Sequence, residues 1–377
     1  MYVLLISRGI PTSEDPQWGC FEKDQAEALV SLGHKVIVFS VDSRFRLKWR
    51  KIGITECEVN GVKFINLFLF PSILLFNTKI KHKFRNWQFL FLMRKVVKKY
   101  GLPEILYSHF YHNTSHAVVI KNKYHIPLVG IEHAALLNND NIPYKMKYKG
   151  AIAYNNTDAI ISVSKTLSER IKFHFNKDSY VVYNAIGGEF KYCKTAINNA
   201  KLIFIAVGTL EFRKGFDLLV PAFKKANLPK EKWEMRIIGS GKEYINLQKQ
   251  IIESNLDKNI FLLGRKNKNE IVKLLNESNV FILPSRNENF SVAVLEALAC
   301  GLPVISSICG GIKECISDIN GMLFPVDDVD GLAKAIVKMY SNYQFYDRMK
   351  ISEDCQNRFS ASVIANDLTN VFENVLK

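Results

Sequence analysis

Two glutamates eight positions apart stand in the part of the sequence best suited to chemistry. Glu288 lies in a polar loop before an apolar helical stretch, and Glu296 lies on that helix, about two turns from its start. Ionised carboxylates accept hydrogen bonds, so the hydroxyls of sugars and ribose are fitting partners. Glu296 could instead be a solvated helix residue, but its apolar neighbours Leu295 and Ala297 disfavour that interpretation.

The start of this helix is suited to an anion. Asn289, Phe290 and Ser291 come at the beginning of the apolar stretch, where backbone amides have no partner inside the helix. The Phe290 and Ser291 amides would therefore face a ligand, and the helix dipole favours negative charge there.

Glycines and cations follow the strands predicted before this segment. Gly208 ends one predicted strand, and the adjacent cations Arg213 and Lys214 come just before a helix, an arrangement that suits a diphosphate. Gly239 and Arg265 follow the next two strands. Each could be a plain turn. Ligands of open parallel sheets bind beyond the carboxyl ends of the strands, so together these residues predict one nucleotide crevice.

The elements that must position these residues alternate between short β-branched runs and amphipathic helices, which predicts two Rossmann-like, doubly wound α/β domains. The 377-residue length also favours two domains. Strands are predicted at 2–7, 35–40, 62–66, 104–109, 127–131 and 158–163 in the first half, and at 202–207, 234–238, 259–263, 280–284 and 303–306 in the second.

The alternation breaks at the Gly187-Gly188 pair and the polar stretch 191–201, which predicts a domain boundary. We expect an N-terminal domain at 1–190 and a C-terminal domain at 191–360. Residues 361–377 have helical spacing, and this helix could close the second domain or cross back to the first.

Composition places the chain among cytoplasmic proteins. The longest apolar region, residues 64–76, is interrupted by Asn66 and Pro71 and is too short to span a bilayer. The seven cysteines are odd in number and contain no Cys-x-x-Cys pair, so we expect buried thiols rather than disulfides or a zinc site.

Positive charge is concentrated in the first half. Residues 1–195 hold 28 Lys and Arg against 15 Asp and Glu, whereas residues 196–377 hold 23 against 21. Cations and aromatic residues at helical spacing over 79–99, after the apolar stretch 67–76, suit an anionic membrane surface on the cytoplasmic side. A solvated helix that covers its sheet is the alternative interpretation of residues 79–99, and biased codon usage is the alternative explanation of the positive charge in the first half. No nucleic-acid motif accompanies the charge.

These motifs together resemble those of the family 4 retaining glycosyltransferases. Residues 288–296 resemble the family's Glu-x7-Glu motif, which continues here as Glu-Ala-Leu-Ala-Cys-Gly-Leu-Pro-Val-Ile. The resemblance spans nearly the whole chain and is closest over 202–326. Further matches are Arg213-Lys214-Gly215, Gly239-Ser240-Gly241, Gly310-Gly311, Trp18-Gly19-Cys20-Phe21, and Tyr183-Asn184-Ala185, which has Ala where the family has Gly.

The resemblance implies a GT-B fold, with the acceptor on the N-terminal domain and the donor on the C-terminal one. Carried over by residue, Arg213 and Lys214 would hold the donor diphosphate, Glu288 would contact the transferred sugar, and Glu296 would accept the ribose hydroxyls. His133 would lie against the sugar across the cleft, although a His after a strand is more often structural. Gly19 would let the N-terminal loop approach the phosphates. Thr209 departs from the family, which often has Arg there, so charge neutralisation would depend more on Arg213 and Lys214.

The implied reaction moves a hexose-type sugar from a UDP- or GDP-sugar to a saccharide or lipid-linked acceptor, in surface polysaccharide or glycolipid synthesis. No carboxylate suited to a covalent intermediate stands out, so we expect a front-face transfer that needs no metal and no cofactor. Asp328-Val329-Asp330 could imitate a metal-binding Asp-x-Asp, but capping the following helix is the preferred interpretation.

Other functions fit parts of the pattern. A sugar-nucleotide 2-epimerase or hydrolase could use the same fold, and a non-catalytic sugar-nucleotide-binding subunit could use the same site. A dinucleotide oxidoreductase is disfavoured because residues 239–244 lack the third glycine of that fingerprint.

Overall fold

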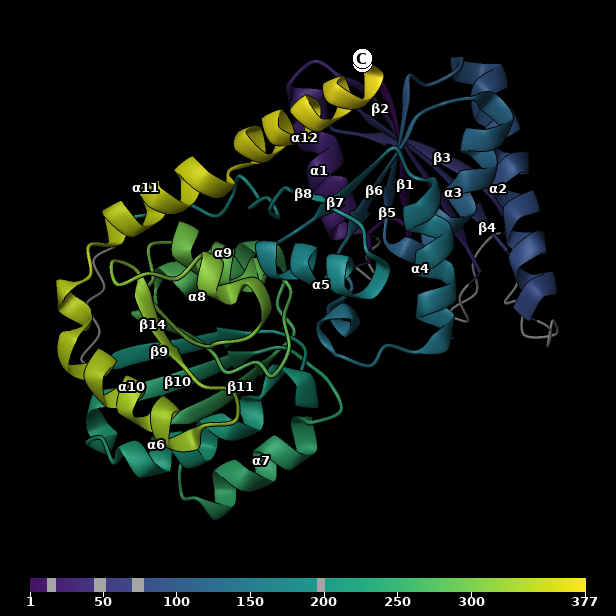
Figure 1. The fold of residues 1–377 in the computed structure, drawn as a ribbon. Helices are drawn as coiled ribbons and strands as arrows, with labels where there is room; N and C mark the ends of the chain where they lie inside the picture. The colour runs from purple at the N-terminus through teal and green to yellow at the C-terminus, as the bar shows by residue number, and fades with distance from the viewer. Residues whose placement is uncertain (12–17, 44–51, 70–77, 195–200) are drawn as a thin grey trace. The chain divides into compact units, whose positions relative to one another are not determined.

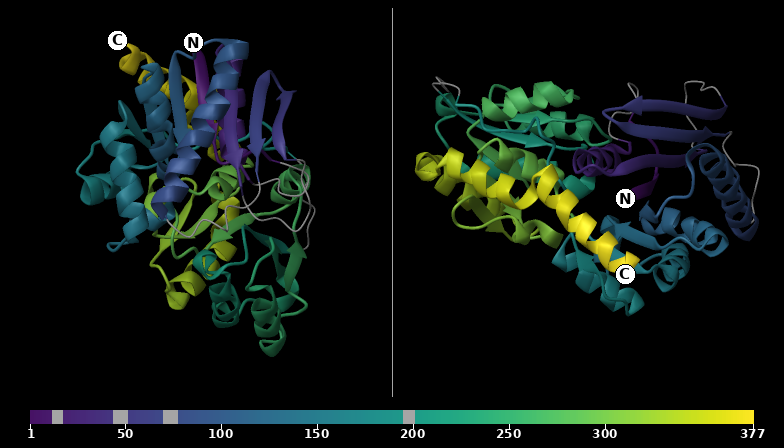
Figure 2. Two further views of the ribbon diagram at one scale, coloured as in Figure 1. Left: turned by 90° about the vertical axis from the view of Figure 1, so that its right-hand side faces the viewer. Right: turned by 90° about the horizontal axis from the view of Figure 1, so that it is seen from above.

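The computed structural model describes residues 1–11, 18–43, 52–69, 78–194 and 201–377. The chain forms two compact units (Figures 1 and 2). The first unit contains Met1–Ala185 and Ala361–Lys377, and the second contains Ile186–Ser360. Residues 70–76 of the predicted apolar region and residues 195–200 of the predicted linker lie outside the described residues.

The division falls after Ala185 rather than after residue 190. The Ile186 amide donates to the Phe359 carbonyl at 3.0 Å. Phe190 is fully buried, and its carbonyl accepts a hydrogen bond of 2.9 Å from Gln356. These contacts tie residues 186–190 to the second unit.

The first unit is built on an eight-stranded sheet in the order β3-β4-β2-β1-β5-β6-β7-β8. Neighbouring strands are parallel except for the antiparallel pair β3 and β4. The strands are β1 (Tyr2–Ser7), β2 (Lys35–Asp42), β3 (Gly53–Val59), β4 (Val62–Phe68), β5 (Ile105–His109), β6 (Leu128–Glu132), β7 (Ala159–Ser162) and β8 (Tyr180–Val181).

Helices cover both faces of this sheet, which is why β1 is buried along its whole length (Figure 1). On one face, Leu4 and Ile6 pack with Phe89 and Leu92 of α2. On the other face, the Tyr107 ring meets Phe372 of α12 edge-on, with ring centres 5.1 Å apart. The helices are α1 (Cys20–Ser31), α2 (Thr78–Tyr100), α3 (Tyr111–Tyr124), α4 (Tyr144–Asn156), α5 (Lys165–Phe175) and α12 (Ala361–Leu376).

The second unit has a six-stranded parallel sheet in the order β11-β10-β9-β12-β13-β14, with helices on both faces (Figure 1). Its strands are β9 (Leu202–Val207), β10 (Trp233–Ile238), β11 (Ile260–Gly264), β12 (Val280–Leu283), β13 (Val304–Ser307) and β14 (Gly321–Phe324). Its helices are α6 (Leu219–Ala226), α7 (Tyr244–Glu253), α8 (Lys268–Asn276), α9 (Val292–Ala299), α10 (Val329–Asn342) and α11 (Arg348–Phe359).

Both sheets reverse their strand order once. In the first sheet the chain moves outward from β1 in one direction and then returns to β5 on its other side. In the second sheet β9 and β12 have the same relationship. Ligands of doubly wound folds bind at the carboxyl ends of such strand pairs, so the loops after β1, β5, β9 and β12 are the places to look for a site.

No helix among the described residues combines the length and apolar composition needed to cross a bilayer. The seven cysteines are all free thiols. Cys300, Cys309, Cys315 and Cys355 are buried, but Cys57 and Cys193 are exposed and Cys20 is partly exposed, so the prediction of buried thiols is wrong for these three.

Candidate functional site

A cluster of charged side chains lies at the strand reversal of the second sheet. Lys214, which follows β9, donates a hydrogen bond of 2.5 Å to Oε1 of Glu288, which follows β12. The Arg213 guanidinium lies 3.4 Å from the same oxygen and donates to the Asn287 carbonyl at 2.9 Å. Ser285 Oγ donates to that carboxylate at 2.9 Å. The structure thus brings Arg213, Lys214 and Glu288 together, as a phosphate and sugar site would require.

This cluster carries more positive than negative charge. Two cations share one carboxylate, and an ammonium has three N–H donors, of which Lys214 gives one to Glu288. The Glu288 side chain is only 9% exposed and that of Lys214 only 12%. Partial burial strengthens the attraction of such a group for an anion.

Glycines hold the loops of this site close together. The Lys214 side chain crosses Gly208, where an added Cβ would lie 3.6 Å from Lys214 Cε. A Cβ on Gly239, which has a φ of +152°, would lie within 2 Å of the Gly208 carbonyl oxygen. Gly239 is therefore required for contact between two backbone segments, and its predicted contact with the donor stays a prediction.

The helix after Glu288 starts later than the sequence predicted. α9 begins at Val292, with Ser291 as its N-cap, so Phe290 precedes the helix. Glu296 consequently lies four residues into the helix, about one turn rather than two. The reason is that Glu288 and Asn289 are held in the loop, the latter by a 2.7 Å hydrogen bond from the Gly311 amide to the Asn289 carbonyl.

Asn289 and Arg265 occupy very different environments. The Asn289 side chain is 5% exposed, and neither its oxygen nor its nitrogen has a hydrogen-bond partner among the described residues. A buried amide left unpaired is costly, which is typical of a group that binds a ligand. Arg265 is exposed after β11, three strands along the sheet from β12, so the structure does not bring it to Glu288.

Arg286 organises this site, and sequence reasoning missed it. Its guanidinium pairs with Asp217 at 2.8 Å and with Asp327 at 2.6 Å, and it lies 3.8 Å from the centre of the Phe212 ring. Its side chain also donates to the Phe212 carbonyl, and its amide donates to the Arg213 carbonyl at 2.8 Å. Arg286 therefore joins the loop that carries Lys214 to the loop that carries Glu288.

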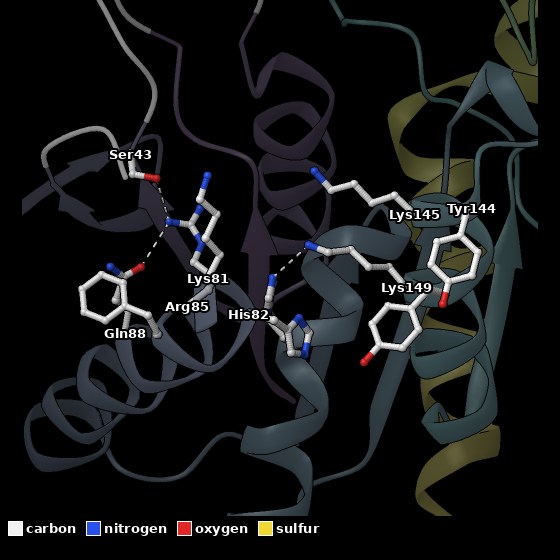
Figure 3. Close-up of a pocket in the computed structure, with 11 residues that line it drawn as sticks. Ser43, Lys81, His82, Arg85, Gln88, Tyr144, Lys145 and Lys149 are labelled. Carbon is white, nitrogen blue, oxygen red and sulfur yellow. Dashed lines mark hydrogen bonds between the residues drawn. The ribbon is translucent and has the colours of Figure 1, made fainter. Parts of the chain in front are cut away.

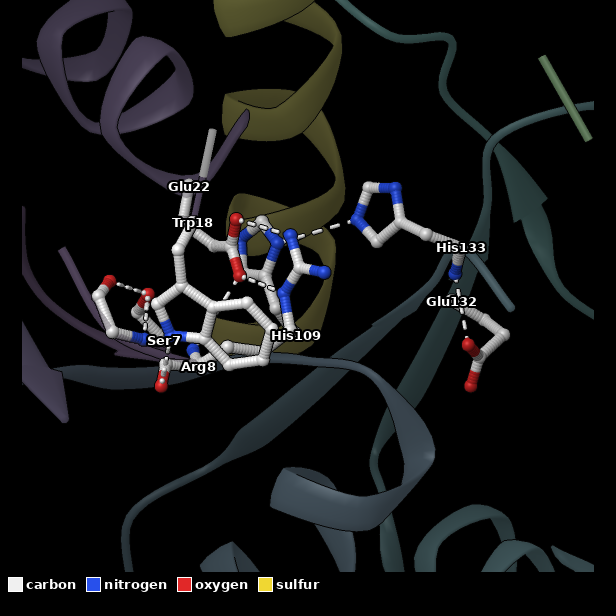
Figure 4. Close-up of polar contacts among 8 residues, drawn as sticks. Ser7, Arg8, Trp18, Glu22, His109, Glu132 and His133 are labelled. Atoms are coloured by element: carbon white, nitrogen blue, oxygen red, sulfur yellow. Dashed lines mark hydrogen bonds and ion pairs between the residues drawn. The ribbon is translucent and has the colours of Figure 1, made fainter. Parts of the chain in front are cut away.

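A second polar cluster lies at the strand reversal of the first sheet (Figure 4). Arg8, which follows β1, pairs with the fully buried carboxylate of Glu22 on α1 through contacts of 2.8 and 3.1 Å. Burial opposes ionisation of Glu22, but the charge and hydrogen bonds of Arg8 outweigh it and lower the pKa of this carboxyl to about 2. Glu22 is therefore ionised at neutral pH.

His133 joins this cluster from the end of β6. Its Nε2 lies 3.2 Å from Nδ1 of His109, the last residue of β5, and the two rings are stacked (Figure 4). Burial lowers the pKa of His133 well below its usual range, and the neighbouring His109 lowers it further. Burial also lowers the pKa of His109, to about 4. Both imidazoles are therefore neutral at pH 7.

Glu132 fixes the backbone that carries His133. Its buried carboxylate accepts hydrogen bonds from the Tyr154 hydroxyl, and from the amides of Tyr111, His133 and Ala134, at 2.6–2.9 Å. The sequence could have indicated His109, because it ends the strand next to the one that leads to His133. Arg8 and Glu22 carried no such signal, since their pairing spans 14 residues and depends on the fold.

Gly19 is the N-cap of α1 and adopts a left-handed conformation with φ of 81°. A Cβ there would lie 2.3 Å from the Gly9 carbonyl oxygen, so glycine is needed for packing between the β1 loop and the start of α1. Gly9, in the described part of the loop after β1, is thereby held against the start of this helix.

The Asp328 side chain accepts a 2.8 Å hydrogen bond from the Gly331 amide and caps α10, which confirms the predicted capping role. Among the described residues, no group of three or more His, Cys, Asp or Glu side chains is arranged to hold a metal ion.

Comparisons with known proteins identify the family. The model of Glycosyltransferase Family 4 matches residues 23–187, and the model of Glycosyl transferases group 1 matches residues 189–354. An uncharacterized glycosyltransferase from Methanocaldococcus jannaschii is 26% identical over 281 residues, which cover 72% of this chain and 76% of that protein.

Two further matches, one by sequence and one by structure, cover more of this chain. The phosphatidylinositol N-acetylglucosaminyltransferase GPI3 subunit of Saccharomyces cerevisiae is 23% identical, over 83% of this chain and 69% of that protein. The solved structure of Anabaena Alr3699/HepE in complex with UDP has the same fold, with a TM-score of 0.76, 16% identity and 99% of both chains covered. The two family models together span most of the chain, and the chain belongs to the family 4 glycosyltransferases of GT-B type.

Proposed function

We propose that this glycosyltransferase moves a hexose-type sugar, with retention of anomeric configuration, from a UDP- or GDP-sugar to a saccharide or lipid-linked saccharide. The observation that supports it best is the convergence of Lys214 and Arg213 on Glu288 at the strand reversal of the second sheet. The complex of Anabaena HepE with UDP, which has the same fold, agrees with a nucleotide-linked donor.

The reaction makes specific demands on these residues. Cleavage of the bond between sugar and phosphate leaves negative charge on the diphosphate, which the remaining N–H groups of Lys214 and the Arg213 guanidinium would stabilise. The first amides of α9 add positive potential at the same end. In the front-face transfer that we propose, the leaving phosphate takes the proton of the acceptor hydroxyl. No metal takes part in this mechanism.

We assign binding roles to the remaining residues in line with the family. Glu288 would accept a hydrogen bond from a hydroxyl of the transferred sugar, and the buried amide of Asn289 would contact the same ligand. Glu296 would bind the ribose hydroxyls. His133, neutral at pH 7, can donate or accept a hydrogen bond and would contact the sugar.

We further propose that the acceptor is presented at an anionic membrane surface, as in surface polysaccharide or glycolipid synthesis. On α2, Phe84, Trp87 and Phe91 form a stacked row, and Trp87 is 57% exposed. Exposed lysines and arginines flank this row, including Lys83 and Arg94. Aromatic side chains beside cations are typical of surfaces that bind anionic lipid. The name of the yeast relative, which refers to phosphatidylinositol, agrees with a lipid acceptor.

The donor is tested first, by measuring thermal stabilisation with a panel of UDP- and GDP-sugars. Turnover of the stabilising donor is then compared with and without an acceptor extract. Acceptor-dependent turnover with retained configuration is the expected result. Release of free or isomerised sugar without acceptor would indicate a hydrolase or 2-epimerase, and binding without turnover would indicate a non-catalytic subunit.

The membrane proposal is tested by sedimentation with neutral phosphatidylcholine vesicles and with vesicles that also contain phosphatidylglycerol. We expect binding only to the anionic vesicles, and weaker binding in 1 M salt because charges are then screened. Equal binding to both vesicles would contradict the electrostatic model.

A further inference from the structure

A pocket of about 300 Å³ lies in the first unit between α2, α3 and α4. Its lining does not include Arg8, Glu22, His109 or His133 of the second polar cluster described above. This volume is at the lower end of the range for small-molecule sites. The pocket lies near the carboxyl ends of the strands, because Ser43 follows β2 and α4 follows β6. Ligands of open α/β sheets bind on that side.

Four cations line the pocket, two from α2 and two from α4: Lys81, Arg85, Lys145 and Lys149. Figure 3 shows Lys145 and Lys149 reaching from α4 toward His82 and Arg85 on α2. None of the described side chains that line the pocket is acidic. Asp42 lies outside the lining and interacts electrostatically with Arg85. Four cations with one such carboxylate nearby are suited to a ligand with more than one negative charge.

Arg85 and Lys149 make hydrogen bonds to neutral groups. The Arg85 guanidinium donates to Ser43 Oγ and Gln88 Oε1, each at 3.3 Å. Lys149 Nζ lies 3.3 Å from His116 Nε2. Burial lowers the pKa of Lys149 to about 8, and the nearby charges of Lys145 and Arg85 contribute to this shift. The ammonium is thus poorly solvated and would gain from a bound anion.

Two imidazoles complete the wall of the pocket. His116 Nδ1 lies 2.6 Å from Asn86 Oδ1, and the ring centres of His82 and His116 are 4.4 Å apart. The buried Nδ1 of His82 has no hydrogen-bond partner among the described residues. Burial lowers the pKa of both imidazoles, so both are neutral. His116 donates its single N–H to Asn86 Oδ1 and accepts from Lys149 through Nε2, so His82 is the imidazole that can donate an N–H to an anion.

Aromatic side chains form the rim. Tyr144 is 82% exposed and Tyr148 is 47% exposed, and their rings are stacked with centres 6.4 Å apart. Phe84 of α2, which also belongs to the exposed aromatic row, lines the same pocket. A cationic pocket with an aromatic rim fits a phosphate group that is attached to a less polar chain or to a sugar ring.

We propose that this pocket binds the phosphate or diphosphate group of the acceptor substrate. This inference rests on the proposed function, because it specifies the acceptor of the same transfer reaction. A phosphate is favoured over a single carboxylate because four cations converge on the pocket and the carboxylate of Asp42, near Arg85, offsets only part of their charge, so a doubly charged group neutralises them better. The phosphate could come from a lipid-linked or a soluble acceptor.

The histidines offer a local probe of this site. All eight lie between residues 34 and 174, so none belongs to the second unit. We would label the histidines of the full chain with 13C and titrate inorganic pyrophosphate while following the Cε1–H signals, in a Lys214→Ala background that weakens the donor site. We expect saturable shifts confined to His82, His116 and their neighbour His112.

The matched variants separate pocket charge from overall charge. Lys145→Met with Lys149→Met should weaken pyrophosphate binding at least tenfold and abolish the shifts. Lys98→Met with Lys123→Met, which removes two exposed cations from the same unit, should change neither. If the first pair does not fold, Lys145→Gln at the exposed rim should still weaken binding severalfold. Unchanged His82 and His116 signals on titration, or equal binding of malonate, would overturn the proposal.

Two ligands identify the source of the phosphate. Glucose 1-phosphate represents a soluble acceptor, and dodecyl phosphate in neutral detergent micelles represents a lipid-linked one. At least tenfold tighter binding of dodecyl phosphate supports a lipid source and use of the tyrosine rim, whereas equal binding supports a soluble source. If the proposed function is wrong, no sugar nucleotide will be turned over. If only this inference is wrong, turnover will be intact and the histidine signals will not shift on titration.

Discussion

Lys214 and Glu288, 74 positions apart in the sequence, are joined by a hydrogen bond of 2.5 Å across the strand reversal of the second sheet. The bond links the group expected to bind the leaving diphosphate to the group expected to bind the sugar. Because Arg213 and Ser285 contact the same carboxylate oxygen, a change at any of these residues should affect both parts of the donor.

Replacement of Lys214 by Ala should lower kcat by roughly 10²–10³-fold, the effect typical of removing one preorganised group that stabilises charge in the transition state. Lys249→Ala is the control, since this lysine is 72% exposed on α7. Steady-state kinetics with the stabilising donor provide the measurement. Near-normal turnover by the Lys214 variant would refute its assignment to the diphosphate.

Arg286→Lys should raise the donor KM about tenfold and change kcat less, because Arg286 positions the loops and a lysine keeps the charge but cannot form the same paired contacts. The unfolding midpoint, measured by urea denaturation, should fall only slightly. A drop in kcat as large as that of the Lys214 variant, with unchanged KM, would show that Arg286 acts on the reaction itself.

Glu22→Gln should destabilise the protein at pH 7 by about 3–5 kcal/mol, because it leaves the partly buried Arg8 without its counter-charge. The pKa of Glu22 is about 2 in the folded protein and about 4.3 in an unfolded chain. The stabilisation is therefore complete above about pH 5 and is lost as the pH falls toward 2. Urea unfolding of wild type and variant at pH 7 and pH 3.5 should show the difference shrinking in acid.

His133 should produce no inflection near pH 6.5 in the profile of kcat/KM. Burial and the neighbouring His109 keep its pKa well below that value, so it gains a proton only in stronger acid. His133→Asn, which keeps hydrogen-bonding capacity, should retain more activity than His133→Ala at every pH. An acid limb near pH 6.5 in the wild type that disappears in both variants would show that the imidazole titrates there.

Exhaustive treatment with EDTA should leave turnover within twofold of the untreated enzyme, because in our proposal cationic side chains and helix amides balance the charge of the leaving group. Mg²⁺ and Mn²⁺ added back to the treated enzyme provide the comparison. Loss of activity with EDTA that Mg²⁺ or Mn²⁺ restores would replace the proposed mechanism with metal-assisted departure of the diphosphate.

The parallel core of both sheets could be predicted from the sequence, because strands buried on both faces form continuous apolar runs. β1 and β9 have the predicted limits. β3 was missed, since it is an edge strand with largely exposed residues such as Glu56 and Glu58 and so lacks an apolar run.

The candidate site was predictable only where a motif spans a few residues. Glu288 and Lys214 lie in such motifs, and strand order brings them together. The contacts of Arg286 with Asp217 and Asp327 join residues 69 and 41 positions apart, which no local pattern indicates. The late start of α9 depends on the Gly311 amide, which belongs to another loop.

The docking of α12 against α1 and Tyr107 has a consequence for how the chain matures. The final helix supplies Phe372, fully buried, to a unit whose other residues end at Ala185. Residues 361–377 are synthesised after the continuous stretch 186–360, so the first unit cannot complete its core until they too have left the ribosome. A chain truncated after residue 360 should accordingly show a second unit that resists protease and a first unit that is susceptible.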